Sequence, residues 1–417
     1  MGGPTVTAAA FDDEAFHGDT LFDVESVSSA GATAPERTVT FVHTADWQLG
    51  MTRHFLGPDA QVQFTADRLA AIDRIGALAE TSAAQFVAVC GDVFEDHRVS
   101  AKIVTQALDR LAGFAVPVYL LPGNHDPYNA ASVYRSDVFA KRRPANVVVL
   151  AAPGVHEVAD GVDLVVAPWP TKAPTSDLVG DQVGRLRADD RIRIVVGHGG
   201  IDELSPSSDP SIVALAPLER AAAAEVIDYV ALGDRHSVTE LGATGRVWYS
   251  GAPEATDFDN VETGSGDALV VTLTRGTRRD AQVRAHRVGR WRFRSIEADV
   301  NTAADVEALA TRLDEIADKP TTVVRLGLVG TLSIADHGEL EELLDRSADR
   351  FAAVTRWPSR DDLRVVADPA DVDALGLRGY AAQAAASLVE QANSDAADAP
   401  AARDALGLLG RLSGGVR

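Results

Sequence analysis

Five short polar loops, each directly after a run of apolar residues, constrain this chain more than any other feature of its sequence. The loops are His43-Thr-Ala-Asp46-Trp-Gln48, Gly91-Asp92-Val-Phe-Glu95, Gly123-Asn124-His125-Asp126, Gly197-His198-Gly199 and Gly233-Asp234-Arg235-His236. A single Gly-Asp or Gly-His pair is ordinarily a turn, but open sheets build their sites at the carboxyl ends of strands. Carboxylate, amide and imidazole groups bind metals, so five such loops predict a convergent metal site.

The apolar runs predict a sheet-rich domain with helices between its strands. Nine runs are short enough to be strands, and they span residues 39–42, 86–89, 116–121, 147–150, 164–167, 192–196, 229–232, 246–249 and 268–273. A helix is predicted over residues 60–80, with an apolar stripe of Phe64, Leu69, Ile72, Ile75 and Leu78. Another is predicted over residues 100–111, with Ser100 as its N-cap. Strands that alternate with helices predict an α/β domain with layered sheets.

By its pattern the chain divides into four segments. Residues 1–38 are rich in small residues and acids, which predicts a disordered acidic tail, and the layered domain covers residues 39–289. Strands over 291–296, 322–328, 352–355 and 363–366, with helices over 303–316 and 337–344, predict a small α+β domain of residues 290–370. Residues 371–417 predict a helical segment, with one helix over 372–391 and a short amphipathic helix over 401–412.

Composition restricts the cell compartment and the partners. The 417 residues carry a net charge of −22, which by itself argues against sequence-independent DNA binding. Cys90 is the single cysteine, so we expect no intrachain disulfide and a cytoplasmic location. No apolar run approaches the ~18 residues that a membrane span needs, so we expect no membrane association.

A basic stretch stands out against this acidic background. Between Arg275 and Arg294 there are eight arginines and one acid, Asp280. Arg290, Arg292 and Arg294 alternate with two aromatic residues, so a strand here would place the three arginines on one face. Two interpretations stay open: a surface that tracks phosphates, or a solvated strand face with core aromatics behind it.

The five loops together resemble those of the calcineurin-like metallophosphoesterases. More narrowly, the phrase His43-Thr-Ala-Asp46-Trp47-Gln48-Leu49-Gly50 and the pair Gly91-Asp92-Val93-Phe94 and Arg98-Val99-Ser100 resemble the SbcD-like DNA nuclease branch. The resemblance covers about residues 39–366. It implies a four-layer α/β/β/α sandwich, followed by a small α+β capping domain and C-terminal helices.

The resemblance also implies a site with two divalent ions. In it Asp92 bridges the ions, the first ion takes Asp46, Gln48 and His236, and the second takes Asn124, His198 and Asp234. His125 binds no metal and stabilises the transition state or protonates the leaving oxygen. Two ions about 3.5–4 Å apart clamp a phosphate and activate water, which is what phosphodiester hydrolysis requires.

This sequence departs from the family at two ligand positions, because the family has His where Gln48 and Asp234 stand. One interpretation is a retuned site, richer in oxygen donors, that prefers Mn²⁺, or Mg²⁺, to Zn²⁺. The other is a decaying site that binds metal poorly. We favour retuning, because both replacements still coordinate metals and the six other site residues remain.

The function that the resemblance implies is a metal-dependent DNA exonuclease in DNA repair, working with an SMC-like ATPase and pairing as a homodimer. Two alternatives stay open: a phosphodiesterase that acts on nucleotides, and a non-catalytic scaffold that binds DNA or the ATPase. Arg235 either contacts a phosphate or points outward. The short C-terminal helix either docks on the ATPase or packs on its own domain.

Three other polar residues near the loops receive structural interpretations. We expect His43 to make a hydrogen bond within the fold rather than to bind metal. Cys90 ends an apolar strand, so it is expected to be a small buried hydrophobe. Asp126 is expected to order its own loop.

Overall fold

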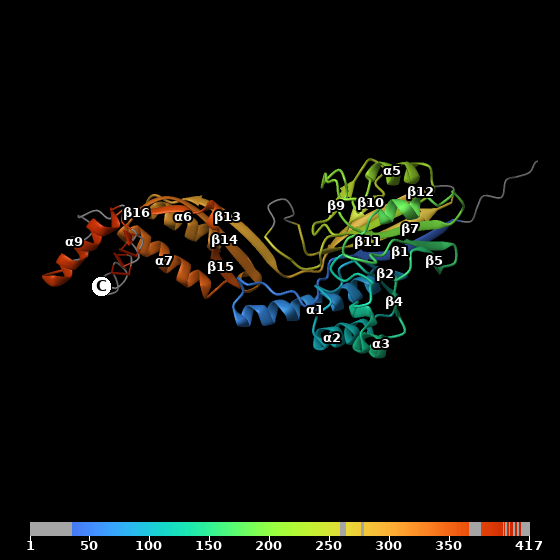
Figure 1. The fold of residues 1–417 in the computed structure, drawn as a ribbon, viewed down its shortest axis with the longest axis horizontal. Helices are drawn as coiled ribbons and strands as arrows, with labels where there is room; N and C mark the ends of the chain where they lie inside the picture. The colour runs from blue at the N-terminus through green and yellow to red at the C-terminus, as the bar shows by residue number, and fades with distance from the viewer. Residues whose placement is uncertain are drawn as a thin grey trace, which may run out of the picture.

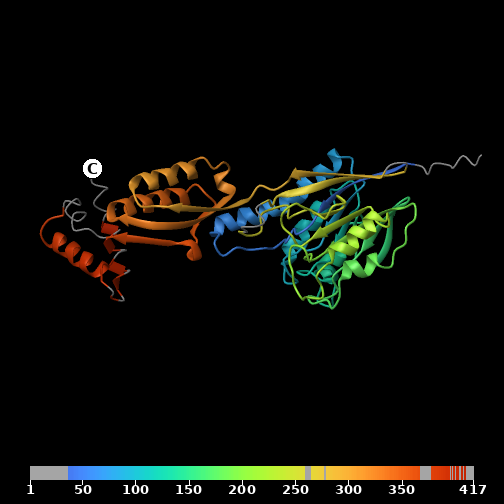
Figure 2. The ribbon, with the colours of Figure 1, turned by 90° about the horizontal axis from the view of Figure 1, so that it is seen from above.

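The computed structural model of the protein describes residues 36–258, 264–276, 279–366 and 377–394, and also residues 396, 398, 399, 401, 402, 405, 406, 408 and 409. The predicted acidic tail therefore lies outside the described residues up to position 35. A larger sandwich of two sheets and a smaller unit of sheet and helices lie next to each other, and helix α1 (Pro58–Thr81) reaches from the first toward the second (Figures 1 and 2). None of the helices described combines the length and the apolar character needed to cross a membrane.

The first sheet has six strands in the order β12-β11-β1-β2-β3-β4. The four strands from β1 to β4 run parallel, β11 pairs antiparallel with β1, and β12 pairs antiparallel with β11. The strands are β1 (Arg37–Thr44), β2 (Phe86–Cys90), β3 (Val118–Leu121), β4 (Val147–Val149), β11 (Asp267–Arg275) and β12 (Arg279–Arg287). The apolar runs predicted all of these except β12, most of whose residues are polar.

The second sheet also has six strands, in the order β5-β6-β7-β8-β10-β9. Its four inner strands run parallel, and the two edge strands are antiparallel to their neighbours. The strands are β5 (Gly154–Ala159), β6 (Val162–Val166), β7 (Ile192–His198), β8 (Tyr229–Gly233), β9 (Thr239–Leu241) and β10 (Val247–Tyr249). The runs predicted the inner strands, whereas the less buried edge strands β5 and β9 gave no comparable signal.

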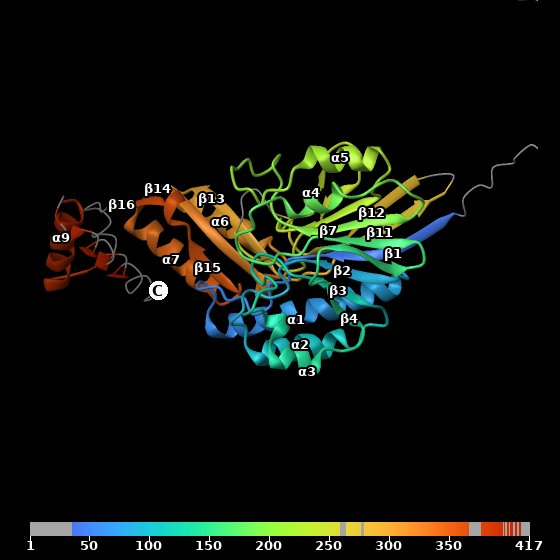
Figure 3. The same cartoon turned by 45° about the vertical axis from the view of Figure 1, so that its right-hand side comes forward.

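Helices cover the outer face of each sheet, which gives four layers (Figure 3). They are α1, α2 (Ala101–Leu111) and α3 (Asp137–Arg142) on the first sheet, and α4 (Leu178–Val183) and α5 (Leu215–Ala223) on the second. In β1, Phe41 packs in the core between the sheets and the next residue, Val42, packs under the helices. Both faces of the strand are thus buried, which is why its sequence is continuously apolar. The predicted four-layer sandwich is confirmed.

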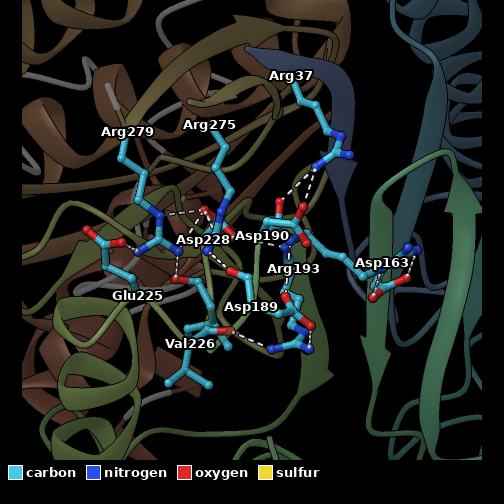
Figure 4. Close-up of polar contacts among 12 residues, drawn as sticks. Arg37, Asp163, Asp189, Asp190, Arg193, Glu225, Val226, Asp228, Arg275 and Arg279 are labelled. Atoms are coloured by element: carbon cyan, nitrogen blue, oxygen red, sulfur yellow. Dashed lines mark hydrogen bonds and ion pairs between the residues drawn. The ribbon is translucent and has the colours of Figure 1, made fainter. Parts of the chain in front are cut away.

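A network of ion pairs fastens the two sheets together through Asp228, which is only 2% exposed (Figure 4). Its carboxylate lies 3.0 Å from Nη1 of Arg275 and accepts a hydrogen bond from Nε of Arg279 at 2.8 Å. It also accepts from the backbone N–H of Arg193 at 2.8 Å. Two arginines of the basic stretch, on β11 and β12 of the first sheet, are therefore engaged by an acid that precedes β8 of the second.

The smaller unit is built around β14 (Thr322–Ser333), with β13 (Arg292–Asp299) on one side and β15 (Ala353–Arg356) and β16 (Asp362–Val366) on the other. All pairings are parallel. The core of the unit forms where alternate strand residues such as Leu326 and Leu328 pack against α6 (Ala303–Asp314) and α7 (Ile334–Ala348). The elements follow the predicted order of strands and helices.

The C-terminal segment packs on the start of α7. In α9 (Tyr380–Ala392), Ala385 and Val389 share an apolar cluster with Ile334, Ala402 and Leu406. Residues 372–376 of one predicted helix, and 403, 404, 407 and 410–412 of the other, lie outside the described residues. The part of the chain that is described therefore shows the C-terminal segment packing on its own chain.

Candidate metal centre

The predicted ligand loops follow the carboxyl ends of neighbouring strands in the two sheets. Asp46 and Asp92 follow β1 and β2 of the first sheet, while His198 ends β7 and Asp234 follows β8 of the second. Backbone hydrogen bonds join the loops within each sheet, from Asp46 N–H to the Gly91 carbonyl at 3.1 Å and from Gly199 N–H to the Gly233 carbonyl at 3.1 Å. The strand ends thus bring together residues that are far apart in sequence.

Three of the predicted ligands form a compact buried cluster. One ligand atom from each of Asp46, Asp92 and His198 lies within 4.8 Å of the others. Nε2 of His198 is 3.4 Å from Oδ2 of Asp92 and 3.8 Å from Oδ1 of Asp234. The backbone N–H of Asp234 donates to Oδ2 of Asp46 at 3.0 Å. Four predicted ligands therefore lie at one site.

Four site residues have left-handed backbone conformations, which are rare for residues other than glycine. The φ angles are 55° at Asp46, 43° at Gln48, 52° at Asp92 and 106° at Asp234. Each such conformation costs about 1–3 kcal/mol and persists only where the surroundings hold it. Hydrogen bonds such as Gln48 N–H to the Asp92 carbonyl, at 2.8 Å, hold the strained loops against each other.

The glycines of the loops allow the two sheets to approach closely at the site. A Cβ atom on Gly91 would overlap the ring of His198. A Cβ on Gly233 would overlap the carbonyl oxygen of Cys90, and one on Gly123 would overlap Asp92. The Gly-Asp and Gly-Asn pairs are therefore explained by sterics, because a side chain on these glycines would displace the loops that carry the proposed ligands.

The ring of His198 is oriented by contacts at both of its nitrogens. Nδ1 lies 2.8 Å from the Cys90 carbonyl oxygen, so it carries a proton and donates. The amide of Asn124 lies 2.8 Å from Nε2, and with its nitrogen on that side it also donates to Oδ2 of Asp92 at 3.2 Å. A backbone carbonyl that fixes the tautomer in this way is the usual partner of a metal-binding imidazole.

The electrostatics of the cluster favour a bound positive charge. Burial raises the pKa of Asp46 well above its ordinary value, and the nearby Asp92 and Asp234 carboxylates add to the effect. Burial also disfavours the charged form of His198, but the carboxylates of Asp92, Asp46 and Asp234 outweigh it and raise the pKa of His198. Burial opposes ionisation of Asp92 as well, yet His198 outweighs it and lowers the pKa of Asp92. The buried carboxylates therefore favour a positive charge among them, as a bound divalent cation would supply.

The donor set fits a divalent cation. Three carboxylates and an imidazole converge, and Oε1 of Gln48 is buried without a hydrogen-bond partner among the described residues. Leaving a buried polar atom unpaired costs about 1–3 kcal/mol, and coordination of a cation offsets such a cost. Oxygen-rich sites of this kind suit Mn²⁺ and Mg²⁺.

His236 has a more buried setting than a solvated loop histidine. Its Nδ1 lies 2.7 Å from Oγ1 of Thr256. Burial, with Arg68 nearby, lowers the pKa of His236 to about 4. The ring is therefore neutral at pH 7, as a metal-binding imidazole must be.

Residues 39–238 match the family model of calcineurin-like phosphoesterases. This part of the chain, which we call the phosphoesterase domain, is therefore similar to the calcineurin-like phosphoesterases. Among solved structures, the chain is similar to a dimetal phosphatase from Danio rerio, with 11% sequence identity, a TM-score of 0.36, and coverage of 59% of this chain and 98% of the other. A second solved structure has 13% identity and a TM-score of 0.34, with 60% and 99% of the two chains covered. The family supports metal-dependent phosphoester hydrolysis by the domain.

In the phosphoesterase domain, His125 lies beside the cluster rather than in it. Its backbone N–H donates to Oδ1 of Asp92 at 2.9 Å, and its Nδ1 lies 2.8 Å from the Glu95 carbonyl oxygen. The other ring nitrogen, Nε2, is 4.0 Å from Oδ2 of Asp92, and the side chain is 39% exposed. His125 is thus fixed at one nitrogen, while the other faces the site from a position that solvent reaches.

The three residues given structural interpretations make such contacts in the phosphoesterase domain. His43 bonds with the Tyr229 hydroxyl at 3.2 Å and the Leu232 carbonyl at 3.1 Å. Asp126 accepts from the backbone of Gly123 and Phe94 and from the Tyr134 hydroxyl. Cys90 is fully buried.

The predicted substrate arginines lie in different surroundings. Nε of Arg235 donates to Oγ1 of Thr239 at 2.9 Å, and Nη1 of Arg290, which precedes β13, lies 3.3 Å from Asp67. Arg292 and Arg294 are exposed and line a groove of about 820 Å³ beside β13. Its charged and aromatic lining residues are Arg287, Arg292, Arg294, Arg312, Arg360, Asp257, Glu297, Glu315, Trp291, Phe293 and Trp357. The groove thus has five arginines against three acids, and no predicted metal ligand lines it.

Two charged residues near the phosphoesterase site, Arg68 and Glu95, lie outside the predicted set of site residues. Arg68 on α1 is buried, and burial lowers its pKa to about 10, with Glu254, Glu95 and Asp46 among the nearby charges. Glu95 carries a buried Oε2 atom without a hydrogen-bond partner among the described residues. Arg68 lies within α1, outside the five polar loops, so no motif marks it. Glu95 ends the loop Gly91-Asp92-Val-Phe-Glu95, but that motif assigned it no role.

Proposed function

We propose that the chain is a divalent-metal-dependent DNA nuclease, an exonuclease that hydrolyses phosphodiesters in DNA repair. The observation that carries the hydrolytic step is the buried cluster of Asp46, Asp92 and His198 within the phosphoesterase domain. The choice of DNA rests on the resemblance of the first two loops to the SbcD-like nuclease branch. The arginine-lined groove beside β13 supports an extended anionic substrate.

In this proposal the ions are held as the resemblance implies. Asp92 would be shared between them, Asp46, Gln48 and His236 would hold the first, and Asn124, His198 and Asp234 would hold the second. Bound divalent ions, Mn²⁺ or Mg²⁺, would neutralise charge on the phosphoryl oxygens and lower the pKa of water. Gln48 supports the assignment, because its buried amide oxygen has no other partner among the described residues.

His125 is the proposed general acid. The Glu95 carbonyl oxygen, 2.8 Å from Nδ1, sets the orientation of the ring. Because Nδ1 donates to that carbonyl, Nε2 carries a transferable proton only in the imidazolium form, and this form would protonate the leaving oxygen. The solvent exposure of the side chain leaves room for a bulky substrate.

The surface for the DNA backbone is proposed to include Arg292 and Arg294 in the groove, together with Arg290 and Arg235. Of the aromatic residues beside the groove, Trp291 is fully buried and Trp357 is 9% exposed, so the arginines carry the proposed contacts with DNA. Phosphate contacts of this kind make binding weaken as salt rises. They also offset locally the repulsion between DNA and a chain of net charge −22.

The proposal includes the partners and the compartment that the sequence predicts. The C-terminal helices are proposed to dock on an SMC-like ATPase, two copies of the chain to pair as a homodimer, and the complex to act in the cytoplasm. Co-purification of the chain with such an ATPase, lost when residues 371–417 are deleted, tests the first point. Sedimentation of the chain alone tests the second.

The deciding experiment measures DNA hydrolysis by purified protein in Mn²⁺, in Mg²⁺ and in a chelator. Linear duplex, hairpin and single-stranded DNA should be degraded from an end in the presence of metal, and the Asp92→Asn variant should be inactive. Hydrolysis of nucleotides alone would favour the nucleotide phosphodiesterase. Metal binding too weak to detect, with DNA bound and not cut, would favour the scaffold.

The groove assignment has a separate test with a matched control. The double variant Arg292→Gln and Arg294→Gln should raise KM for DNA and flatten its salt dependence, while a small phosphodiester is hydrolysed at the wild-type rate. Arg284→Gln removes an exposed arginine of the same basic stretch that does not line the groove. Equal losses in both variants would assign the effect to net charge rather than to the groove.

A further inference from the structure

Arg68 is a buried cation to which the proposed chemistry assigns no role. It lies on α1 with 3% of its surface exposed. Its guanidinium carbon is 5.1 Å from the centre of the Phe64 ring. Nη1 donates to the Ala255 carbonyl oxygen at 2.9 Å, and Nη2 donates to the Trp47 carbonyl oxygen at 2.9 Å. One planar group therefore joins two backbone segments that are some 200 residues apart, as the positions of its two acceptors show.

One segment carries two proposed ligands of the first ion, and the other carries a residue that contacts the third. Trp47 lies between Asp46 and Gln48 in the first loop. Ala255 directly precedes Thr256, whose Oγ1 atom lies 2.7 Å from Nδ1 of His236. A shift of either segment would therefore move Asp46 and Gln48 relative to His236.

The choice of arginine also fits this role. A buried positive charge close to a cation site raises the electrostatic cost of binding the cation, so it needs a compensating benefit. The guanidinium is a rigid fork that reaches two acceptors at once, whereas a lysine ammonium is a point charge on a flexible stem. Two equal distances of 2.9 Å to two separate carbonyls use that fork.

We propose that Arg68 is a positioning residue for the first cation: it fixes the spacing between the loop of Asp46 and Gln48 and the segment that orients His236. The inference rests on the dimetal site of the proposed function. None of the hydrogen bonds that Arg68 makes in the described part of the chain reaches Asn124, His198 or Asp234. Removing Arg68 should therefore weaken the binding of the first cation and leave the binding of the second unchanged.

Arg74, on the same helix, provides a matched control. It donates to Oε1 of Glu254 at 2.6 Å and to the Val288 carbonyl oxygen. Glu254 also accepts from the backbone N–H groups of Arg290 and Trp291. Through Glu254, which directly precedes Ala255, Arg74 is linked to the start of the smaller unit. None of its hydrogen bonds in the described part of the chain reaches the loop of Asp46. Its loss removes a contact of the buried Glu254 carboxylate at a position that holds no proposed ligand.

The test is a Mn²⁺ titration of the metal-free, full-length protein, with free Mn²⁺ followed by electron paramagnetic resonance. Wild type should bind two ions. Arg68→Met should lower the affinity for one ion by about 10- to 100-fold, which is the usual effect of losing a group that orients metal ligands. The affinity for the other ion should not change. Arg74→Met should bind both as the wild type does, although its melting temperature falls.

Arg68→Lys keeps the charge but reaches one carbonyl, so it should weaken the same ion to a smaller extent. This variant carries the test if Arg68→Met does not fold. Wild-type affinity for both ions in either Arg68 variant would overturn the inference, as would an equal loss in Arg74→Met. Failure of the wild type to bind Mn²⁺ would instead reject the dimetal site itself, and with it the proposed function.

Discussion

The buried ring of His43 allows a prediction of how the free energy of unfolding changes at acidic pH. The ring is fully buried, with Nδ1 3.2 Å from the Tyr229 hydroxyl and Nε2 3.1 Å from the Leu232 carbonyl oxygen. Nε2 therefore carries the proton and donates to the carbonyl, and the neutral ring accepts from the hydroxyl. Burial lowers the pKa of His43 to about 3, although the bond to Leu232 opposes the shift.

The lowered pKa of His43 sets the sign and the size of the change in the free energy of unfolding with pH. A histidine in the unfolded chain titrates near pH 6.5. Below that pH the unfolded state binds a proton that the folded state does not, so the free energy of unfolding falls with pH until about pH 3. Each pH unit is worth about 1.4 kcal/mol, so His43 should account for a loss of about 2 kcal/mol between pH 7.5 and pH 5.0.

Urea unfolding of the metal-free protein, followed by tryptophan fluorescence at pH 7.5, 6.5 and 5.0, measures the effect. The His43→Gln variant should be less stable than the wild type at pH 7.5 but should lose about 2 kcal/mol less between pH 7.5 and pH 5.0. His286→Gln changes an exposed ring on β12 and should leave the wild-type curve unaltered. If the free energies of unfolding of the wild type and of His43→Gln fell equally between pH 7.5 and pH 5.0, His43 would not be the source of the pH dependence.

Three further changes test other parts of the account. Gly233→Ala places a Cβ against the Cys90 carbonyl and should destabilise the fold by about 1–3 kcal/mol in urea unfolding; a variant with wild-type stability would show that the strand ends have room to separate. Asp228→Ala leaves two arginines without their shared carboxylate and should cost about 3–5 kcal/mol by the same assay, and a loss below about 1 kcal/mol would count against the network. Replacing Gln48 and Asp234 together by His should raise the affinity for Zn²⁺ relative to Mn²⁺ in a competition titration; an unchanged metal preference would argue against retuning.

The sandwich was predictable because its inner strands are buried on both faces. Runs such as 192–196 and 229–232 are continuously apolar, and they became β7 and β8. Ser100 predicted the start of α2 for a local reason, since its side chain accepts from Ile103 N–H at 3.4 Å. Loops that follow neighbouring parallel strands meet at one edge of their sheet, so the approach of Asp46 and Asp92 followed from order along the chain, whereas His198 comes from the second sheet.

The remaining features depend on partners that are distant in sequence. The basic stretch gives no local sign that Arg275 and Arg279 bind Asp228 in the other sheet, rather than joining Arg292 and Arg294 beside the groove. β12 was missed for the same reason, because its charged residues find partners only once the sheets are stacked.

Helix α1 shows a similar limit of sequence patterns. Its apolar stripe left Asp67 and Arg68 on the polar side, yet both are buried. Oδ2 of Asp67 accepts from Nε1 of Trp291 at 3.1 Å, and Arg68 bonds to the loop of Trp47. The helix extends beyond the sandwich toward the smaller unit, and a helical stripe describes contacts with one partner only.

The central claim is that one buried cluster holds divalent ions that hydrolyse a phosphodiester, and paired measurements on Asp92 test it most directly. Mn²⁺ binding and hydrolysis of linear DNA are measured on the same preparations of wild type and Asp92→Asn. We expect the wild type to bind two ions and to show metal-dependent cleavage, and we expect weaker metal binding and no cleavage in the variant. Cleavage that survives in Asp92→Asn, or that proceeds at the wild-type rate in a chelator, would contradict it.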